Sequence, residues 1–243
     1  MSYYQSDLAS IHDDGFGHLA VGGARQLLTA LADSALYQGR IYDLGCGSGI
    51  TARLLADKGY SVIGIDPSEA FVAIARNRVS EATFHVNSFA NVNLTHCVAV
   101  CAIGEVLNYR FDASNHSAAR SDFFKRTFRC LADGGVLLFD VAGPDRAPNG
   151  STQSFVEARD WTVLVETTVQ DCEMTRRIVT FCRDGQHYRR NYESHCLRLL
   201  PPKQVESELS SIGFDVEALD SYGEQRLPLG LYGFCARKPK AAA

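Results

Sequence analysis

One segment constrains the fold more than any other part of the 243-residue chain: Ile41-Tyr42-Asp43-Leu44-Gly45-Cys46-Gly47-Ser48-Gly49. A short apolar run of strand length enters a loop with glycine at every second position, and a helical pattern follows from Ile50. Glycine permits positive φ and lets a ligand lie directly against the main chain. Amides at the start of the following helix can then meet polar groups of that ligand. The segment therefore predicts a strand, a ligand-binding loop and a helix, although such loops also occur as plain tight turns.

A second acid stands where the next strand of the sheet is predicted to end. Residues 60–65 read as a strand, and Asp66 follows it, 23 positions after Asp43. A carboxylate at this edge can accept both hydroxyls of a ribose, as in nucleotide-binding α/β folds. Asp66 can also cap the helix that is predicted to start at Pro67. The two roles do not exclude each other, and ribose binding is the favoured one.

A third polar group follows the strand predicted at residues 83–86. Asn87 and Ser88 come directly after it and precede Phe89. A polar side chain and a backbone amide at this edge can bind the rim of an adenine, while Phe89 or Pro67 covers its face. The alternative is a polar turn with one buried phenylalanine.

Strands and helices are predicted to alternate across about a hundred residues, up to the strand at 136–141. The apolar spacing predicts helices at 19–37, 50–58, 67–79 and 118–131 and strands at 41–44, 60–65, 83–86, 97–103 and 136–141. Alternation with short connections is typical of a parallel sheet with helices on both faces.

The pattern changes after Pro144. Residues 144–151 read as a loop, and alternating strands are predicted at 161–169, 177–182 and 188–199, with a turn at Asp184-Gly185. They indicate an antiparallel meander inserted into the α/β core. A helix at 201–212 and strands at 215–221 and 230–236 complete the chain.

Composition narrows the function classes. Hydrophobic residues make up 46% and charged residues 21%, as in an ordinary folded domain. The net charge of −4 argues against a nucleic-acid partner, which usually needs a basic face. The eight cysteines show neither a Cys-x-x-Cys pair nor zinc-ligand spacing, so no metal site is expected. Without a signal peptide or a membrane-spanning run in the sequence, a cytoplasmic location is expected.

The motif Asp43-x-Gly-x-Gly-x-Gly, Asp66 after the second strand and the terminal antiparallel strand pair resemble the class I S-adenosylmethionine-dependent methyltransferases. The segments 4–16, 102–108 and 131–140 look like those of bacterial members that act on small molecules. The resemblance implies a Rossmann-like, doubly wound α/β fold: a mostly parallel seven-stranded sheet with a terminal antiparallel pair and an inserted antiparallel β-meander. It implies one domain, 1–243, with a lid and first helix (1–38), a cofactor-binding core (39–143), the β insertion (about 150–200) and a return helix with terminal strands (201–238).

The resemblance also implies the cofactor, S-adenosyl-L-methionine, and the product S-adenosyl-L-homocysteine. The glycine loop would cradle the methionine part, Asp66 the ribose, and Asn87 and Ser88 the adenine. The cofactor-binding residues expected are Asp43, Gly45, Cys46, Gly47, Gly49, Asp66, Pro67, Asn87, Ser88, Ala102 and Ile103. Two positions depart from the family pattern, because Asn87 and the run His96-Cys97-Val98 stand where acids are common.

Three residues are candidates for the catalytic step. Methyl transfer is an in-line displacement, so the protein must mainly align the acceptor, exclude water and guide a proton. Glu105 follows the fourth strand and is expected to act as a base or as an anchor for a cationic acceptor; the alternative is a local pairing role. Tyr109 is the second candidate, because similar sugar N,N-dimethyltransferases place an aromatic residue or a histidine nearby. His12, in an aromatic N-terminal strip that folds over the cofactor in related enzymes, is the third, against a structural role.

The expected partner is a small-molecule acceptor. Arginines of the meander, such as Arg176 and Arg177, could roof an acidic acceptor, form a homodimer contact or belong to a solvated face. A nicotinamide-dependent oxidoreductase would carry Gly-x-Gly-x-x-Gly without an acid two positions before the first glycine, which disfavours that activity. A catalytically silent protein that binds S-adenosylmethionine is the other alternative.

Overall fold

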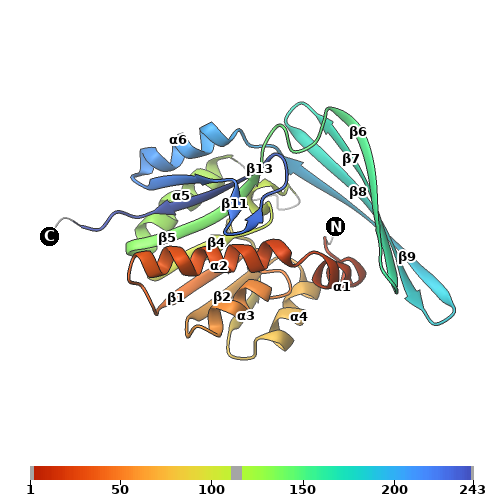
Figure 1. The fold of residues 1–243 in the computed structure, drawn as a ribbon, viewed down its shortest axis with the longest axis horizontal. Helices are drawn as coiled ribbons and strands as arrows, with labels where there is room; N and C mark the ends of the chain where they lie inside the picture. Colours follow the sequence, from red (N-terminus) through yellow and green to blue (C-terminus); the bar gives the residue numbers. More distant parts are fainter. Residues whose placement is uncertain (1–2, 111–116, 242–243) are drawn as a thin grey trace.

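A computed structural model describes residues 3–110 and 117–241, and a seven-stranded sheet forms its centre (Figure 1). The strand order is β10-β13-β5-β4-β1-β2-β3. The strands are β1 (Arg40–Leu44), β2 (Ser61–Asp66), β3 (Thr83–Val86), β4 (Cys97–Ala102), β5 (Leu131–Ala142), β10 (Asp215–Leu219) and β13 (Leu231–Arg237). The pairs β1–β2, β1–β4, β2–β3 and β4–β5 are parallel, whereas β13 is antiparallel to both β5 and β10. The predicted fold class is confirmed.

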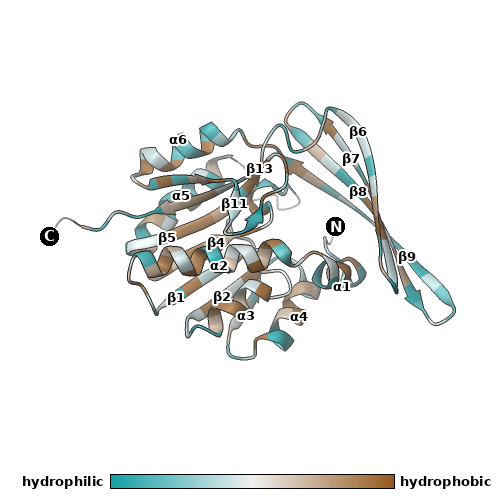
Figure 2. Cartoon of the chain, viewed as in Figure 1, coloured by the Kyte–Doolittle hydropathy of each residue, from teal (hydrophilic) through white to brown (hydrophobic). Residues whose placement is uncertain are grey.

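Helices cover both faces of this sheet. On one face, α2 (His18–Asp33), α3 (Ile50–Ala56) and α4 (Glu69–Arg78) bury residues such as Leu31, Leu55 and Val72 against β1, β2 and β4. On the other, α5 (Ser117–Cys130) and α6 (Pro202–Ile212) bury Phe124 and Leu209. Because helices cover β4 on both faces, every one of its residues is buried. Such a strand reads as a continuous apolar run in the sequence. Figure 2 shows the apolar residues concentrated in the central strands.

The insertion is a four-stranded antiparallel meander in the order β6-β7-β8-β9, which reaches away from the core (Figure 1). Its strands are β6 (Gly150–Glu157), β7 (Trp161–Gln170), β8 (Glu173–Asp184) and β9 (His187–Arg198). The sequence predicted only three of them. Every residue of β6 is exposed, so this edge strand lacks the buried alternate positions that reveal a strand in a sequence. The last two residues of the predicted loop at 144–151 therefore belong to β6.

The N-terminal segment contains a helix that the apolar spacing did not predict. Helix α1 (Ser6–Gly15) precedes α2 and buries Leu8 and Ile11 against Val163 and Ile178 of the meander. These contacts join residues more than 150 positions apart in the chain. The spacing of apolar residues within the segment therefore could not indicate them. Helix α1 therefore lies between the core and the insertion (Figure 1).

Two short elements complete the described chain. The 3-10 helix η1 (Val106–Asn108) follows β4, and a small hairpin of β11 (Ser221–Tyr222) and β12 (Gln225–Arg226) precedes β13. None of the helices in residues 3–110 and 117–241 is long and apolar enough to cross a membrane.

Candidate active site

The glycine loop after β1 has the backbone that alternating glycines permit. Gly45, Gly47 and Gly49 have φ values of 66°, 51° and 81°, in the left-handed region. A Cβ on Gly45 would lie 2.4 Å from Val106 Cγ2, so the loop and the segment after β4 approach too closely for any side chain. A Cβ on Gly47 would meet nothing within 4 Å, because it would project into open space. The loop therefore leaves room for a ligand beside Gly47.

Asp66 ends β2 and holds this loop. Its Oδ2 accepts a hydrogen bond from Gly47 N at 3.0 Å, and its Oδ1 accepts one from Ser68 N at 2.8 Å. Burial raises the pKa of Asp66 to about 6, although both hydrogen bonds favour the carboxylate. The side chain that caps α4 is Ser68, whose Oγ accepts from Phe71 N at 3.2 Å. Asp66 is thus not the cap, and each carboxylate oxygen keeps a lone pair for a ligand hydroxyl.

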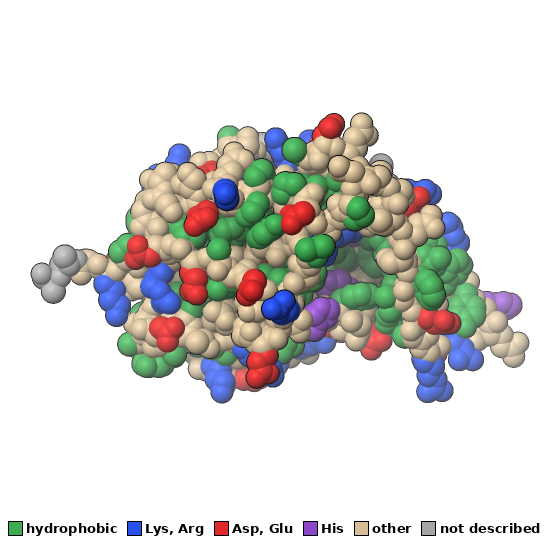
Figure 3. All heavy atoms as spheres, turned by 45° about the horizontal axis from the view of Figure 1, so that its top comes forward, with side chains coloured by type: hydrophobic (Ala, Val, Ile, Leu, Met, Phe, Trp, Pro, Cys, Tyr) green, Lys and Arg blue, Asp and Glu red, His purple; other side chains and the backbone are tan. Residues whose placement is uncertain are grey.

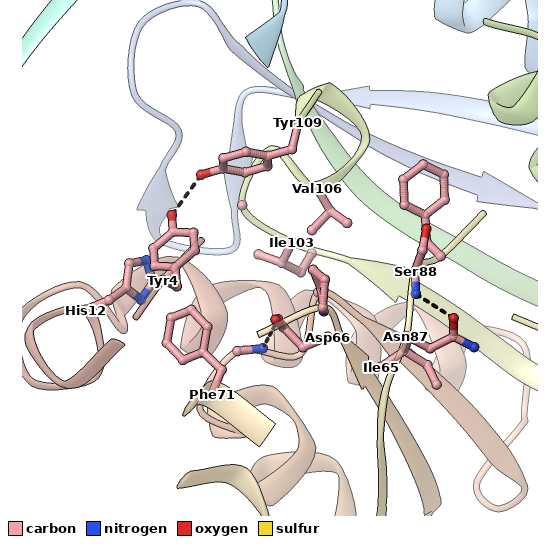
Figure 4. A pocket seen from close by; sticks show the side chains of 15 residues that line it. Tyr4, His12, Ile65, Asp66, Phe71, Asn87, Ser88, Ile103, Val106 and Tyr109 are labelled. Carbon is pink, nitrogen blue, oxygen red and sulfur yellow. Dashed lines mark hydrogen bonds between the residues drawn. The ribbon is translucent and has the colours of Figure 1, made fainter. Parts of the chain in front are cut away.

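A pocket opens beside this loop (Figure 4). This glycine-loop pocket is lined by Tyr4, His12, Gly45, Gly47, Ile65, Asp66, Pro67, Phe71, Asn87, Ser88, Phe89, Ile103, Gly104, Val106 and Tyr109. Asn87 and Ser88 lie at the opposite end from Tyr4, and Asn87 Oδ1 accepts from Ser88 N at 2.8 Å. Acidic, amide and apolar groups thus follow one another along one cleft, which fits a ligand with a ribose between an adenine and an amino-acid part.

Seven of the eleven cofactor-binding residues predicted from the sequence line this pocket, and four do not. Asp43, Cys46, Gly49 and Ala102 are absent from its walls. Gly49 is the N-cap of α3, and its Cβ position would touch Ala75 at 3.0 Å. Asp43 is buried below the loop, where it accepts from Cys101 Sγ at 3.5 Å while its Oδ2 has no partner in the described part of the chain. Burial raises the pKa of Asp43 to about 7.

A second and larger cavity, about 550 Å³, lies between the core and the meander. Figure 3 shows the molecule hollowed at this place. We call it the meander pocket, and its lining includes Leu8, Phe16, Leu19, Glu105, Arg146, Val163, Val165, Met174, Arg176, Ile178, His195 and Leu231. It shares Tyr4, His12, Gly104 and Tyr109 with the glycine-loop pocket. Those four residues mark the junction between the two cavities.

Two tyrosines from distant parts of the chain meet at this junction. The hydroxyls of Tyr4 and Tyr109 are 2.7 Å apart (Figure 4). Tyr4 is fixed through its main chain, because its N–H donates to Glu193 Oε2 at 2.7 Å and its carbonyl accepts from Ser68 Oγ at 2.8 Å. The sequence identified Tyr109 as a site residue, and Tyr4 only as part of an aromatic strip. Nothing local in the sequence indicated Phe71, Glu193 or His195.

Glu105 lies at the inner end of the meander pocket and is bound by two arginines. Its Oε1 accepts from Arg146 Nε at 2.7 Å and Arg176 Nη2 at 3.0 Å, and its Oε2 accepts from Arg176 Nη1 at 2.5 Å. Burial alone would raise the pKa of Glu105, but the two guanidinium groups outweigh it and lower the pKa to about 2. Such a carboxylate is a weak proton acceptor near neutral pH.

His12, unlike the ionised Glu105, is uncharged near neutral pH. Burial lowers the pKa of His12 to about 4, so the imidazole is neutral near pH 7. Its ring packs edge-on against Tyr4 and Phe71, with centroids 5.5 and 5.6 Å away, and makes no hydrogen bond to any described residue. The ring nitrogens of His12 are therefore available to a ligand at the junction.

Comparison with known proteins agrees with this geometry. A family model for the methyltransferase domain matches residues 16–219. The Bacillus subtilis protein YqeM, which bears a methyltransferase name, is 26% identical over 226 residues, covering 86% of this chain and 85% of YqeM.

Solved structures show the same fold at low sequence identity. An S-adenosylmethionine-dependent methyltransferase from Clostridium acetobutylicum superposes with a TM-score of 0.81 at 18% identity, covering 96% of this chain and 98% of that chain. The sugar N-methyltransferase KedS8 from Streptoalloteichus has a TM-score of 0.76 at 19% identity, covering 99% of this chain and 96% of KedS8. The family match over most of the sequence identifies the chain as a member of the methyltransferase domain family, and its fold is that of S-adenosylmethionine-dependent methyltransferases.

Proposed function

We propose that the glycine-loop pocket binds S-adenosylmethionine and the meander pocket binds the small-molecule acceptor, so that methyl transfer takes place at their junction. The observation that carries this proposal is that Tyr4, His12, Gly104 and Tyr109 line both cavities. When bound, S-adenosylmethionine supplies a methyl group activated by a positive sulfur. The chain itself aligns the acceptor and excludes water.

The cofactor is held by residues from the ends of three neighbouring strands. Gly45 and Gly47 provide backbone against which the methionine part lies, and Asp66 accepts the ribose hydroxyls. Asn87 and Ser88 bind the adenine rim, with Phe89 and Pro67 as apolar walls. Asp43 acts indirectly, from below the loop.

The released proton is accepted by His12 when the acceptor is an amine or a hydroxyl. His12 lines both pockets and keeps its nitrogens unbonded within the described chain, and its pKa of about 4, although low for a base, is closer to neutral than that of Glu105. Tyr4 and Tyr109 orient the acceptor through their paired hydroxyls. Glu105 acts as a positioning residue through Arg146 and Arg176 instead of as the base.

A methyltransferase assay tests this function. The protein is incubated with methyl-labelled S-adenosylmethionine and fractions of a bacterial metabolite extract, and S-adenosylhomocysteine is measured. With the acceptor identified, His12→Gln is expected to lower turnover ~10²-fold while changing the affinity for S-adenosylhomocysteine by no more than a few-fold. His85→Gln, at an exposed position of β3, is the control and should change neither quantity. Full turnover in His12→Gln would remove the proposed role of this histidine.

Two further assignments belong to this proposal. All eight cysteines are free thiols, which fits a reducing cytoplasm.

The outer face of the meander carries one apolar row of cross-strand neighbours: Phe155, Leu164, Val179 and Tyr192. Glu166 and Arg177 flank this row with opposite charges, so a second copy of the chain can pack on it in a two-fold arrangement. Light scattering of wild type and Phe155→Asp tests the dimer, which the added charge should weaken.

A further inference from the structure

The meander pocket contains an ion cluster with one more positive than negative charge. Glu105 is bound by both Arg146 and Arg176 at 2.5–3.0 Å. Of the described residues that line this pocket, these three are the formally charged ones when the histidines are counted as neutral. The lining therefore carries one net positive charge facing a cavity whose other walls are largely apolar, whereas the nearby carboxylate of Asp140 is buried behind the loop and accepts backbone N–H groups there.

The two guanidinium groups are positioned to bind a further group. The side chains of Arg146 and Arg176 keep about a fifth of their surface exposed (22% and 19%), whereas Glu105 keeps 7%. Arg146 uses Nε for Glu105 and Nη1 for the carbonyl of Leu229 at 3.4 Å, and within the described chain its Nη2 donates to no acceptor. Both arginines thus face the pocket, while the carboxylate that holds them is covered.

The cluster is rigid because its centre is fixed from behind. Glu105 adopts a positive φ of 64°, next to Gly104 with φ of 94°. The carboxylate of Asp140 accepts the N–H groups of both residues. A guanidinium whose orientation is already fixed loses little freedom on binding an anion, and planar N–H groups match a carboxylate.

We propose that Arg146 and Arg176 form an anion-binding subsite of the acceptor pocket, and that the methyl acceptor has an apolar body with a carboxylate or a similar anionic group. This inference rests on the proposed function, because it names the class of molecule that occupies the meander pocket. The anionic end lies against Arg146 and Arg176, and the apolar body lies against Val163, Met174 and Ile178.

Calorimetry on the full chain saturated with S-adenosylhomocysteine tests the subsite. The probes are matched pairs, benzoate with benzamide and 2-naphthoate with 2-naphthamide, and benzylamine represents the cations. The acids are expected to bind about tenfold or more tightly than their amides, because an arginine forms charge-assisted hydrogen bonds only with the anion.

Variants identify the residues responsible. Arg146→Gln and Arg176→Gln should each remove most of the preference for acids. Arg177→Gln is the matched control, because Arg177 neighbours Arg176 in β8 but points to the opposite face and pairs with Glu166. It should retain the preference.

The outcomes separate the two proposals. Equal binding of acids and amides, a preference for benzylamine, or an unchanged preference in both pocket variants would overturn the anion subsite while leaving methyl transfer intact. Failure of S-adenosylhomocysteine to bind would instead overturn the proposed function, and the subsite with it.

Discussion

The carboxylate of Asp140 accepts a hydrogen bond from the backbone N–H of Glu105 at 2.6 Å. Asp140 also accepts from Gly104 N at 2.9 Å and from the Tyr222 hydroxyl at 2.9 Å. A residue in the middle of the sheet therefore determines the backbone of the loop after β4, including the left-handed conformation of Glu105. That conformation costs about 1–2 kcal/mol for a residue with a Cβ, and the three hydrogen bonds to one carboxylate offset it.

Replacing Asp140 should therefore loosen this loop. Asp140→Asn presents an N–H₂ group to backbone donors, which leaves at least one buried donor unsatisfied, so we expect the free energy of unfolding to fall by about 1–3 kcal/mol. Denaturant titration at pH 8 measures the change. Tyr222→Phe removes one donor and keeps the carboxylate, and it should cost less. An equal loss in both variants would mean that the bonds to Gly104 and Glu105 do not determine the loop.

Asp66→Ala should weaken the affinity for S-adenosylhomocysteine by roughly 30- to 1000-fold, because two charge-assisted bonds to ribose hydroxyls are lost. It should also lower stability, since Gly47 N and Ser68 N lose their acceptor. Titration calorimetry and thermal melting separate the two effects. Glu69→Ala, exposed in the first turn of α4, is the control for a lost negative charge and should bind normally.

Gly47→Val should abolish cofactor binding, because the new side chain would enter the open space beside the loop. The positive φ of 51° adds a backbone cost of about 1 kcal/mol, which alone would not prevent binding. Gly59→Val isolates that cost, since Gly59 also has a positive φ and open surroundings but lies outside the pocket. Comparable binding losses in the two variants would contradict the placement of the ligand.

Glu105→Gln should destabilise the protein by about 3–5 kcal/mol, the usual cost of removing one partner from a buried ion pair. Two partly buried arginines would then share an uncharged amide. Glu173→Gln is the surface counterpart, because Glu173 pairs with Arg110 and both are half exposed. It should cost no more than about 1 kcal/mol. Denaturant unfolding of both variants checks the difference, and a small effect at Glu105 would mean that the cluster is solvated.

The raised pKa of Asp43 predicts how the stability of the ligand-free protein depends on pH. Its pKa is about 7 in the folded chain, against about 4 when unfolded. Between these values the folded state binds more protons than the unfolded state, so the contribution of Asp43 to stability decreases as pH rises from 4 to 7. Asp43→Asn lacks this titration. Its stability relative to wild type should rise over that window, and parallel curves would show that Asp43 is ionised when folded.

The sequence predicted those parts of the molecule whose causes are local. The glycine loop, Asp66 and the alternation of the core depend on φ values and apolar spacing within a few residues, and the structure confirms the fold they indicated. The pairing of Glu105 depends on Arg146 and Arg176, which are 41 and 71 positions away in the chain. An isolated glutamate after a strand therefore read as a candidate base.

The same limit explains the missed elements. The apolar residues of α1 pack on the meander, and β6 is an exposed edge strand with no buried alternate positions. In each case the segment is held by residues far away in the sequence. Its apolar residues therefore show neither the 3.6-residue period of a helix nor the two-residue period of a strand clearly.

The N-terminal segment connects the two cavities thermodynamically. Tyr4 and His12 belong to both linings, and the segment is tied to the meander through the ion pair of Asp7 with Arg189 and to the core through that of Asp13 with Arg78. A ligand in either cavity contacts this one stretch of chain, so the two binding equilibria share the same residues. Cofactor and acceptor binding should consequently be coupled. Linkage then demands reciprocity: the factor by which the first changes the affinity for the second equals the factor by which the second changes the affinity for the first.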